Sequence, residues 1–181
     1  MKYILALLVV LGAGATAFFL TQDQQVVIRL SEDQLLKAVE KKLPFEKNYL
    51  VLFDVTLDNP RITLVDGSER VLAGLDVAVE IRLGNKPPLR GSTDISGNVR
   101  YAPEGGEFYL VDPDIETLSI EGIPMAYTDK IDEVMTKALG AFFKTRPIYT
   151  LKETDTKQAA AKLVLKDVAV ENSELVLTLG L

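Results

Sequence analysis

Apolar and polar residues alternate with a period of two along most of residues 48–122, and no other feature limits the fold as strongly. Successive side chains of a β-strand point to opposite faces, so this pattern predicts strands with one buried and one solvent-facing side. In the longest run, Val71–Leu83, every second residue is apolar. The turn signal Asp66-Gly67 precedes that run. Residues 48–122 are therefore predicted to form a meander of antiparallel strands.

The alternation also predicts which side chains face the interior. In the longest run we expect Val77 and Val79 to face the long helix that follows the meander, whereas Asp76 and Glu80 face solvent or the outer side of the sheet. Before the meander, Val26–Leu30 is a short strand candidate, and the period of two begins at Asn48 with what reads as one strand. Its apolar row consists of Tyr49, Val51, Phe53, Val55 and Leu57.

A short amphipathic helix is predicted before the meander, beginning at Ser31. Ser31 and Gln34 have the spacing of a capping box, in which each side chain bonds to the backbone of the other residue. Pro44 ends the helical pattern. Apolar residues recur at helical spacing at Leu35, Leu36, Val39 and Leu43.

A longer helix is predicted directly after the meander. Pro124 suits the first helical position, and Arg146-Pro147 ends the pattern. Between them runs an apolar stripe of Tyr127, Ile131, Val134, Met135, Ala138, Leu139 and Phe142.

These elements predict an α+β fold in which a long helix is wrapped by a strongly curved antiparallel meander sheet. The strands exceed the usual length of about 5 to 6 residues, and a flat sheet of that length would leave too large an apolar face for a short helix. An N-terminal amphipathic helix and a C-terminal hairpin complete the fold. The second strand of that hairpin carries Leu175, Leu177, Leu179 and Leu181.

The start of the chain has the pattern of an export signal or a membrane anchor. Lys2 precedes the charge-free run Ile4–Leu20, which lies at the short end of the roughly 17 to 25 residues that cross a bilayer. We expect residues 1–22 to anchor the protein in the inner membrane of a Gram-negative envelope. Residues 23–181 then form a single periplasmic domain.

Cleavage of this segment is the alternative. Ala15-Thr16-Ala17 fits the small-x-small pattern that signal peptidase recognises. Cutting there would leave Phe18-Phe19-Leu20 as an apolar start, which favours the uncleaved anchor. A cleaved chain would be soluble in the periplasm.

The composition excludes several classes of function. The chain contains no Cys, no His and no Trp, which excludes serine–histidine and cysteine–histidine catalysis, the usual zinc sites, disulfides and lipid-modified cysteine. A net charge of −6 disfavours nucleic acid as a partner. Asp112, Asp114 and Glu116 have calcium-loop spacing, but Thr117 stands where such a loop needs glycine. We therefore expect no metal, no cofactor and no enzymatic activity.

The residues that could hold a ligand are apolar. If the interior is hollow, a lipid or similar molecule would lie between the second helix and the sheet, whereas the same pattern is also that of a filled core. The expected lining is Leu35, Val39, Phe53, Val77, Val79, Ile131, Met135, Leu139 and Phe142.

A resemblance adds weight to the hollow alternative. Phe142-Phe143 followed by Arg146-Pro147-Ile148-Tyr149-Thr150-Leu151-Lys152-Glu153, together with the order of elements, resembles the YceB-like family of bacterial lipoproteins. That family is similar to the tubular lipid-binding (TULIP) superfamily, in which apolar ligands lie between a long helix and a curved sheet. The resemblance implies lipid binding. Family members carry a lipobox cysteine that this chain lacks, so the N-terminal segment would replace acylation as the anchor.

The sequence thus predicts a non-enzymatic protein of the cell envelope that binds a lipid or other apolar ligand. Its partners would be the membrane, through the N-terminal segment, and that ligand; protein partners are unknown. The alternative is a ligand-free interaction or scaffold module with a packed interior. A hydrolase that uses carboxylates ranks third, because it would need two facing carboxylates in a polar cleft.

Overall fold

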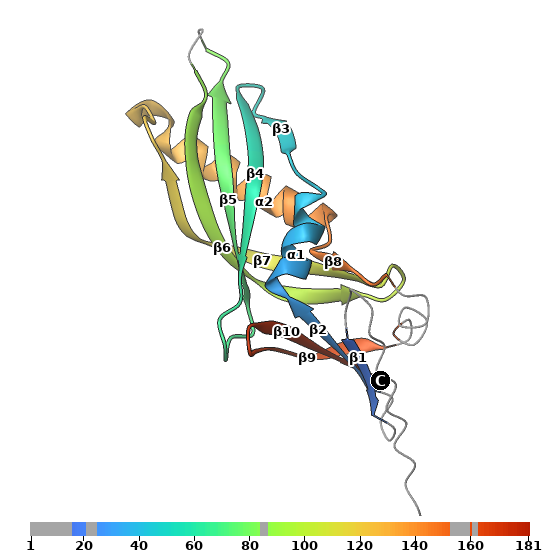
Figure 1. Ribbon diagram of the computed structural model, residues 1–181. Coiled ribbons are helices and arrows are strands. Elements are labelled where there is room, and N and C mark those ends of the chain that lie inside the picture. Colours follow the sequence, from blue (N-terminus) through green and yellow to red (C-terminus); the bar gives the residue numbers. More distant parts are fainter. Residues whose placement is uncertain (1–15, 21–24, 84–86, 153–159, 161–162) are drawn as a thin grey trace, which may run out of the picture.

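The strands of the protein form two antiparallel sheets, which Figure 1 shows one above the other. The computed structural model describes residues 16–20, 25–83, 87–152, 160 and 163–181. The elements are β1 (Thr16–Leu20), β2 (Gln25–Ser31), α1 (Glu32–Glu40), β3 (Phe45–Tyr49), β4 (Phe53–Thr63), β5 (Val71–Ile81), β6 (Leu89–Ala102), β7 (Glu107–Ile120), the 3-10 turn η1 (Met125–Tyr127), α2 (Thr128–Thr145), β8 (Tyr149–Thr150), β9 (Val164–Glu171) and β10 (Glu174–Gly180).

The smaller sheet joins the two ends of the chain in the order β1-β2-β10-β9. The predicted C-terminal hairpin is β9 and β10, and β10 also pairs with β2. β1 pairs with β2 from Thr16 opposite Arg29 to Leu20 opposite Gln25. The rest of the proposed anchor, residues 1–15 and 21–22, lies outside the described residues. None of the helices in the described ranges combines the length and the apolar character that a membrane crossing needs.

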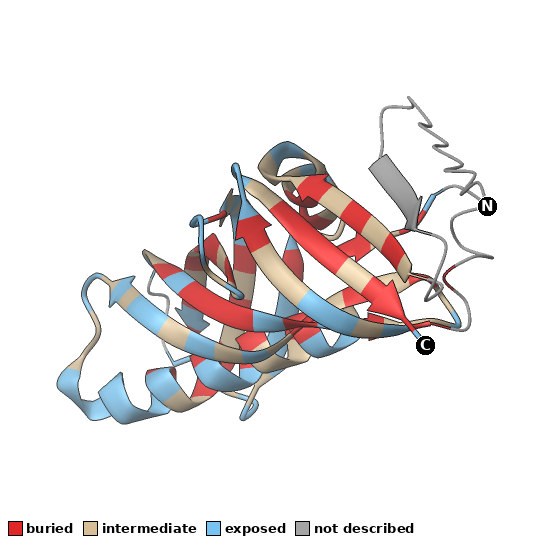
Figure 2. Cartoon of the chain, turned by 90° about the horizontal axis from the view of Figure 1, so that it is seen from below, coloured by how far each residue is buried: buried red, intermediate tan, exposed pale blue. Residues whose placement is uncertain are grey.

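The larger sheet is the predicted meander, with the strand order β3-β4-β5-β6-β7-β8. Buried and exposed residues alternate along its strands, as Figure 2 shows by colour. In β5, Val77 and Val79 are buried, whereas Glu80 is exposed and Asp76 is half-buried. The predicted alternation of buried and outward-facing residues in this strand is confirmed; that Val77 and Val79 face α2 stays a prediction.

The prediction of one unbroken strand from Tyr49 to Leu57 is wrong. β3 ends at Tyr49, and a β-turn closed by the bond from Leu52 N to Tyr49 O leads into β4. The two central residues, Leu50 and Val51, have φ angles of 53° and 62°. Hairpin turns with positive φ are usually marked by Asn or Gly, so the alternating apolar sequence concealed this turn.

α1 forms for the predicted reason. Ser31 Oγ accepts a bond from Gln34 N at 3.3 Å, and Ser31 N donates to Gln34 Oε1 at 3.0 Å, which completes the capping box. Leu35 and Val39 lie on the buried face of the helix. α1 contacts mainly β4.

α2 starts later than predicted and ends as predicted. Pro124 is the N-cap of η1 rather than the first residue of the α-helix, and α2 begins at Thr128. Arg146 is the C-cap, in extended geometry, which fits the proline that follows it. Figure 1 shows α2 crossing one face of the larger sheet, where it contacts β7 most extensively. The described residues confirm the α+β class, with antiparallel strands and the helices α1 and α2. Strong wrapping of the sheet around α2 stays a prediction.

Candidate functional site

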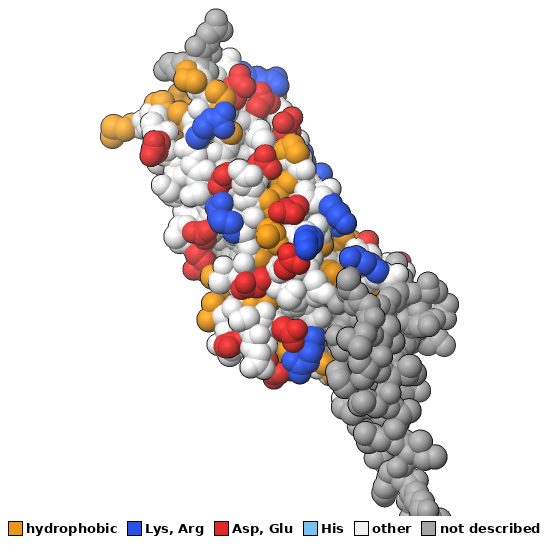
Figure 3. Space-filling model, in the orientation of Figure 1, with side chains coloured by type: hydrophobic (Ala, Val, Ile, Leu, Met, Phe, Trp, Pro, Cys, Tyr) orange, Lys and Arg blue, Asp and Glu red, His pale blue; other side chains and the backbone are white. Residues whose placement is uncertain are grey.

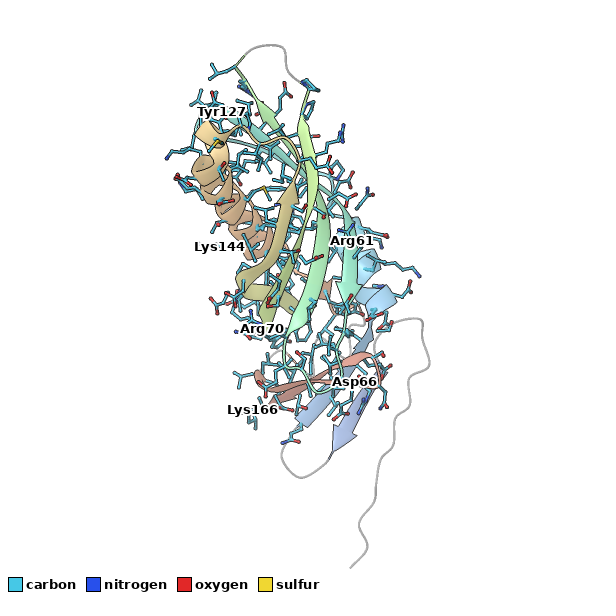
Figure 4. The ribbon with its side chains drawn as sticks, turned by 90° about the vertical axis from the view of Figure 1, so that its left-hand side faces the viewer. Arg61, Asp66, Arg70, Tyr127, Lys144 and Lys166 are labelled. Atoms are coloured by element: carbon cyan, nitrogen blue, oxygen red, sulfur yellow. The ribbon has the colours of Figure 1, made fainter. Side chains whose placement is uncertain are left out.

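α2 turns a broad apolar face toward the larger sheet. Spacings of three and four residues place side chains on one side of a helix, and here that side is fully buried. Figure 4 shows the side chains of α2 and of the sheet meeting between the two, with Tyr127 before the start of the helix and Lys144 near its end. The buried residues of α2 are Ile131, Val134, Met135, Ala138, Leu139, Phe142 and Phe143.

All nine residues predicted to line a ligand site belong to this interior. α1 contributes Leu35 and Val39, β4 contributes Phe53, β5 contributes Val77 and Val79, and α2 contributes the other four. Each is at most 3% exposed, and all nine fall in one continuous cluster of buried residues. The structure therefore brings them into the same core. That they line a cavity stays a prediction.

Aromatic rings close the end of the interface at the C-terminus of α2. The rings of Phe45 and Phe142 are tilted, with centroids 5.5 Å apart, and Phe142 meets Phe143 edge-on at 4.9 Å. The guanidinium of Arg146 lies 4.5 Å from the centroid of Phe45 and 5.4 Å from that of Phe142. A charged group over two rings shields this end from water, because a cation is attracted to the ring face.

The end at the start of α2 is less tightly closed. Tyr127 meets Phe53 edge-on, with ring centroids 6.1 Å apart. Beside Tyr127 the described residues form a small pocket of about 110 Å³. It is lined by Ile81, Leu83, Pro87, Leu89, Gly122, Pro124 and Tyr127. The lining is apolar apart from the tyrosine hydroxyl and the backbone.

Tyr49 adds a polar group to the edge of this interior. It is paired with Phe53 across the β3–β4 turn, so its side chain shares the inward face of the sheet. Its Oη is buried, and no group in the described part of the chain bonds to it. Burial raises the pKa of the Tyr49 hydroxyl, so it stays protonated and can donate a bond. No sequence pattern pointed to this hydroxyl, because Tyr49 ends a strand whose turn was not predicted.

A second pocket, of about 480 Å³, lies between α1 and β8, and most of the residues around it have polar or charged side chains. Lys37, Lys41, Lys42 and Lys152 line it, and none of the nine predicted residues does. Asp33 pairs with Lys37 at 2.7 Å. Burial lowers the pKa of Lys42, with Arg146 acting in the same direction and Glu107 opposing it. Cations near the C-terminus of a helix offset its dipole, which explains Lys37, Lys41 and Lys42 without a ligand.

Two of the three acidic residues with calcium-loop spacing, Asp114 and Glu116, bond to other parts of the chain. Arg70 Nη2 donates to Asp114 Oδ2 at 2.6 Å, and Ser96 Oγ donates to Glu116 Oε1 at 2.5 Å. Within the residues that the structure describes, no three acidic side chains converge as a metal site would require. These two carboxylates tie β7 to β6 and to the loop between β4 and β5.

In comparison with known protein families, residues 30–174 match a family described as "Protein of unknown function (DUF1439)". No curated protein matches the chain significantly. Among solved structures, P47 of Clostridium botulinum E1 is similar with a TM-score of 0.37 and 12% sequence identity. That match covers 92% of this chain and 41% of the other, so this chain spans about two fifths of its length.

Proposed function

The chain belongs to the DUF1439 family of proteins of unknown function, and we propose that it binds a lipid or other apolar ligand between α2 and the larger sheet, without catalysing a reaction. The ligand would replace side-chain contacts along the apolar face of α2. The finer relationship to YceB-like lipoproteins and to the TULIP superfamily is part of the same proposal.

The single observation that carries this proposal is the Tyr49 hydroxyl. Burying a polar group without a partner costs about 1 to 3 kcal/mol, and folded proteins contain few such groups. Tyr49 stands opposite Phe53, whose ring contacts Tyr127 at the pocket beside α2. The polar end of an amphiphilic molecule whose chain lies along α2 could accept a hydrogen bond from the Tyr49 hydroxyl.

A packed scaffold module is the competing function, and the burial of the nine residues favours it. Continuous contact across a core stabilises a fold without any ligand. The two functions differ in what the interior must hold. A scaffold needs no molecule there, whereas a ligand-binding protein should carry one through purification or accept one from solution.

The test is to purify the full chain in a detergent free of fatty acid and phospholipid, extract it with organic solvent and identify the extract by mass spectrometry. We expect one class of amphiphilic lipid in a fixed ratio to the protein, reduced in Tyr49→Phe. Ligand binding is contradicted if the purified protein carries no lipid and, after delipidation, binds no apolar probe at micromolar concentration. The scaffold function would then be the one that remains.

The envelope location is proposed on the N-terminal sequence. If residues 1–22 stay as an anchor, the full chain fractionates with membranes and its intact mass includes Met1. A soluble periplasmic species that begins at Phe18 would instead identify a cleaved signal.

A further inference from the structure

Of the seven large apolar side chains that are exposed in the described part of the chain, four lie at one end of the molecule. We call this end the tip and define it by Leu50, Val51, Leu83 and Met125, which are 49%, 79%, 56% and 96% exposed. The described residues leave three further large apolar side chains exposed, and these lie in the β4–β5 loop, at the start of β9 and at the C-terminus. Figure 3 shows hydrophobic side chains gathered at the end with the β5–β6 loop.

Three separate turns supply the tip, and contacts hold them together. Arg82 N, beside Leu83, donates to Leu52 O of the β3–β4 turn at 2.9 Å. Leu83 and Pro124 line the same small pocket, which places Met125 of η1 next to the β5–β6 loop. Figure 1 shows these turns at one end and β1 at the other. The tip is therefore one surface assembled from distant parts of the sequence.

The β3–β4 turn keeps its apolar residues exposed at a cost in backbone energy. Val51 has a φ of 62°, and a β-branched residue in that region is a steric outlier that costs about 1 to 3 kcal/mol. Asn or Gly would fit the same position without strain and would be more soluble. A side chain that is exposed and has a strained backbone does not stabilise the fold. We therefore look for its role in a contact with another molecule.

The chemistry of the tip fits a bilayer better than a protein partner. Its four side chains are aliphatic or thioether, and they project from convex turns, whereas protein interfaces favour Tyr, Trp and Arg in packed pockets. The adjacent pocket of about 110 Å³ is too small to receive a partner's helix. Nearby exposed charges have both signs, as in Arg82 paired with Asp54 and Lys130 paired with Glu133. Attraction would therefore be apolar rather than electrostatic.

We propose that the tip docks on a lipid bilayer, with Val51, Leu83 and Met125 inserted among the acyl chains. This surface lies outside the interior site, and docking does not require that site to hold a ligand. Each inserted aliphatic side chain contributes by leaving water, as in other interfacial anchors.

The absence of cysteine from the chain allows a position-specific test. The full chain carrying Met125→Cys is labelled with an environment-sensitive fluorophore and mixed with vesicles of phosphatidylethanolamine and phosphatidylglycerol that contain an acyl-chain quencher. The matched control is Val65→Cys, an exposed apolar position in the β4–β5 loop. We expect vesicles to shift and quench the label at position 125 and not at position 65, even at high salt. Position specificity separates docking of the tip from membrane binding by the N-terminal segment.

Val51→Asn is a second test, in which stability and vesicle binding should change in opposite directions. Because Asn tolerates positive φ, the melting temperature should be equal or higher, while vesicle binding by the label at position 125 weakens about tenfold. The proposal is overturned if vesicles leave the label at position 125 unquenched or quench both positions equally. It is also overturned if that label shifts with protein concentration alone, which would make the tip a contact between copies of the chain.

Discussion

At the scale of single residues, Tyr49 and Tyr101 form a matched pair of buried hydroxyls. Tyr101 Oη donates to Ala160 O at 3.3 Å, whereas Tyr49 Oη bonds to no group of the described chain. Tyr101→Phe should lower the free energy of unfolding by about 1 kcal/mol, and Tyr49→Phe should leave it unchanged or raise it. Chemical denaturation of the delipidated proteins measures both.

The same two variants separate stability from ligand binding. Tyr49→Phe should weaken the binding of a fluorescent fatty acid roughly three- to tenfold, because one hydrogen bond is worth about 0.5 to 1.5 kcal/mol. Tyr101→Phe should leave that affinity unchanged. Equal loss of stability in both variants would show that Tyr49 has a partner within the protein.

Glu133 supplies a prediction about pH. Hydrogen bonds from Lys137 at 2.7 Å and Lys130 at 2.9 Å lower the pKa of Glu133 from 4.5 to about 2. A carboxyl whose pKa is lower in the folded state stabilises the protein above its unfolded pKa and loses that effect as the pH falls toward 2. Side-chain NMR should therefore give a titration midpoint near 2. Lys130→Met combined with Lys137→Met should return it toward 4.5, and a parent midpoint near 4.5 would contradict the contacts.

Residue-scale features were the least accessible to sequence. The capping box at Ser31 was predictable, because its two members are three residues apart and their chemistry is local. The exposure of Val51 was not predictable, because an apolar residue in an alternating row indicates burial. Its positive φ angle was not predictable either, because valine rarely adopts that backbone conformation. The missing partner of Tyr49 depends on residues far away in the sequence.

At the scale of elements, β5 offers the sharpest test of register. Val79 is fully buried and Glu80 is exposed, so the two neighbours should respond in opposite ways to charge. Val79→Asp buries an unpaired carboxylate and should unfold the protein, whereas Glu80→Lys should change stability by less than about 0.5 kcal/mol. Circular dichroism during thermal melting distinguishes them. Similar tolerance of both changes would mean that the observed register is wrong.

Elements with strong periodicity were predicted well, and their boundaries less well. β5 and α2 are each buried on one face. One-sided burial produces a periodic pattern of apolar residues, and that pattern is visible in the sequence of each element. The start of α2 was misplaced because Pro124 suits both a 3-10 turn and an α-helix. The separation of β3 from β4 was missed because the turn carries Leu50 and Val51 instead of Asn and Gly.

At the scale of the whole molecule, the sequence predicted the class of fold and the set of residues in the interior. It did not predict that β1 and β2 join the C-terminal hairpin in a sheet of their own, because pairing between chain ends has no local signature. Nor does periodicity distinguish a hollow interior from a filled one, since both require apolar side chains on the same faces. A change of volume inside the core separates them directly.

Leu139→Trp in the full, delipidated chain makes that change of volume, with melting temperature and fatty-acid binding measured on the same sample. Leu139 is buried in α2, and its neighbour Gly140 provides the control, because a methyl group there would meet nothing within 4 Å. Gly140→Ala should raise stability by about 0.5 to 1 kcal/mol and leave binding unchanged. If α2 and the sheet hold a ligand between them, Leu139→Trp keeps its melting temperature and loses the fluorescent fatty acid. A packed interior would instead lose about 1 to 3 kcal/mol of stability, with no binding by the parent protein, and that result would contradict ligand binding.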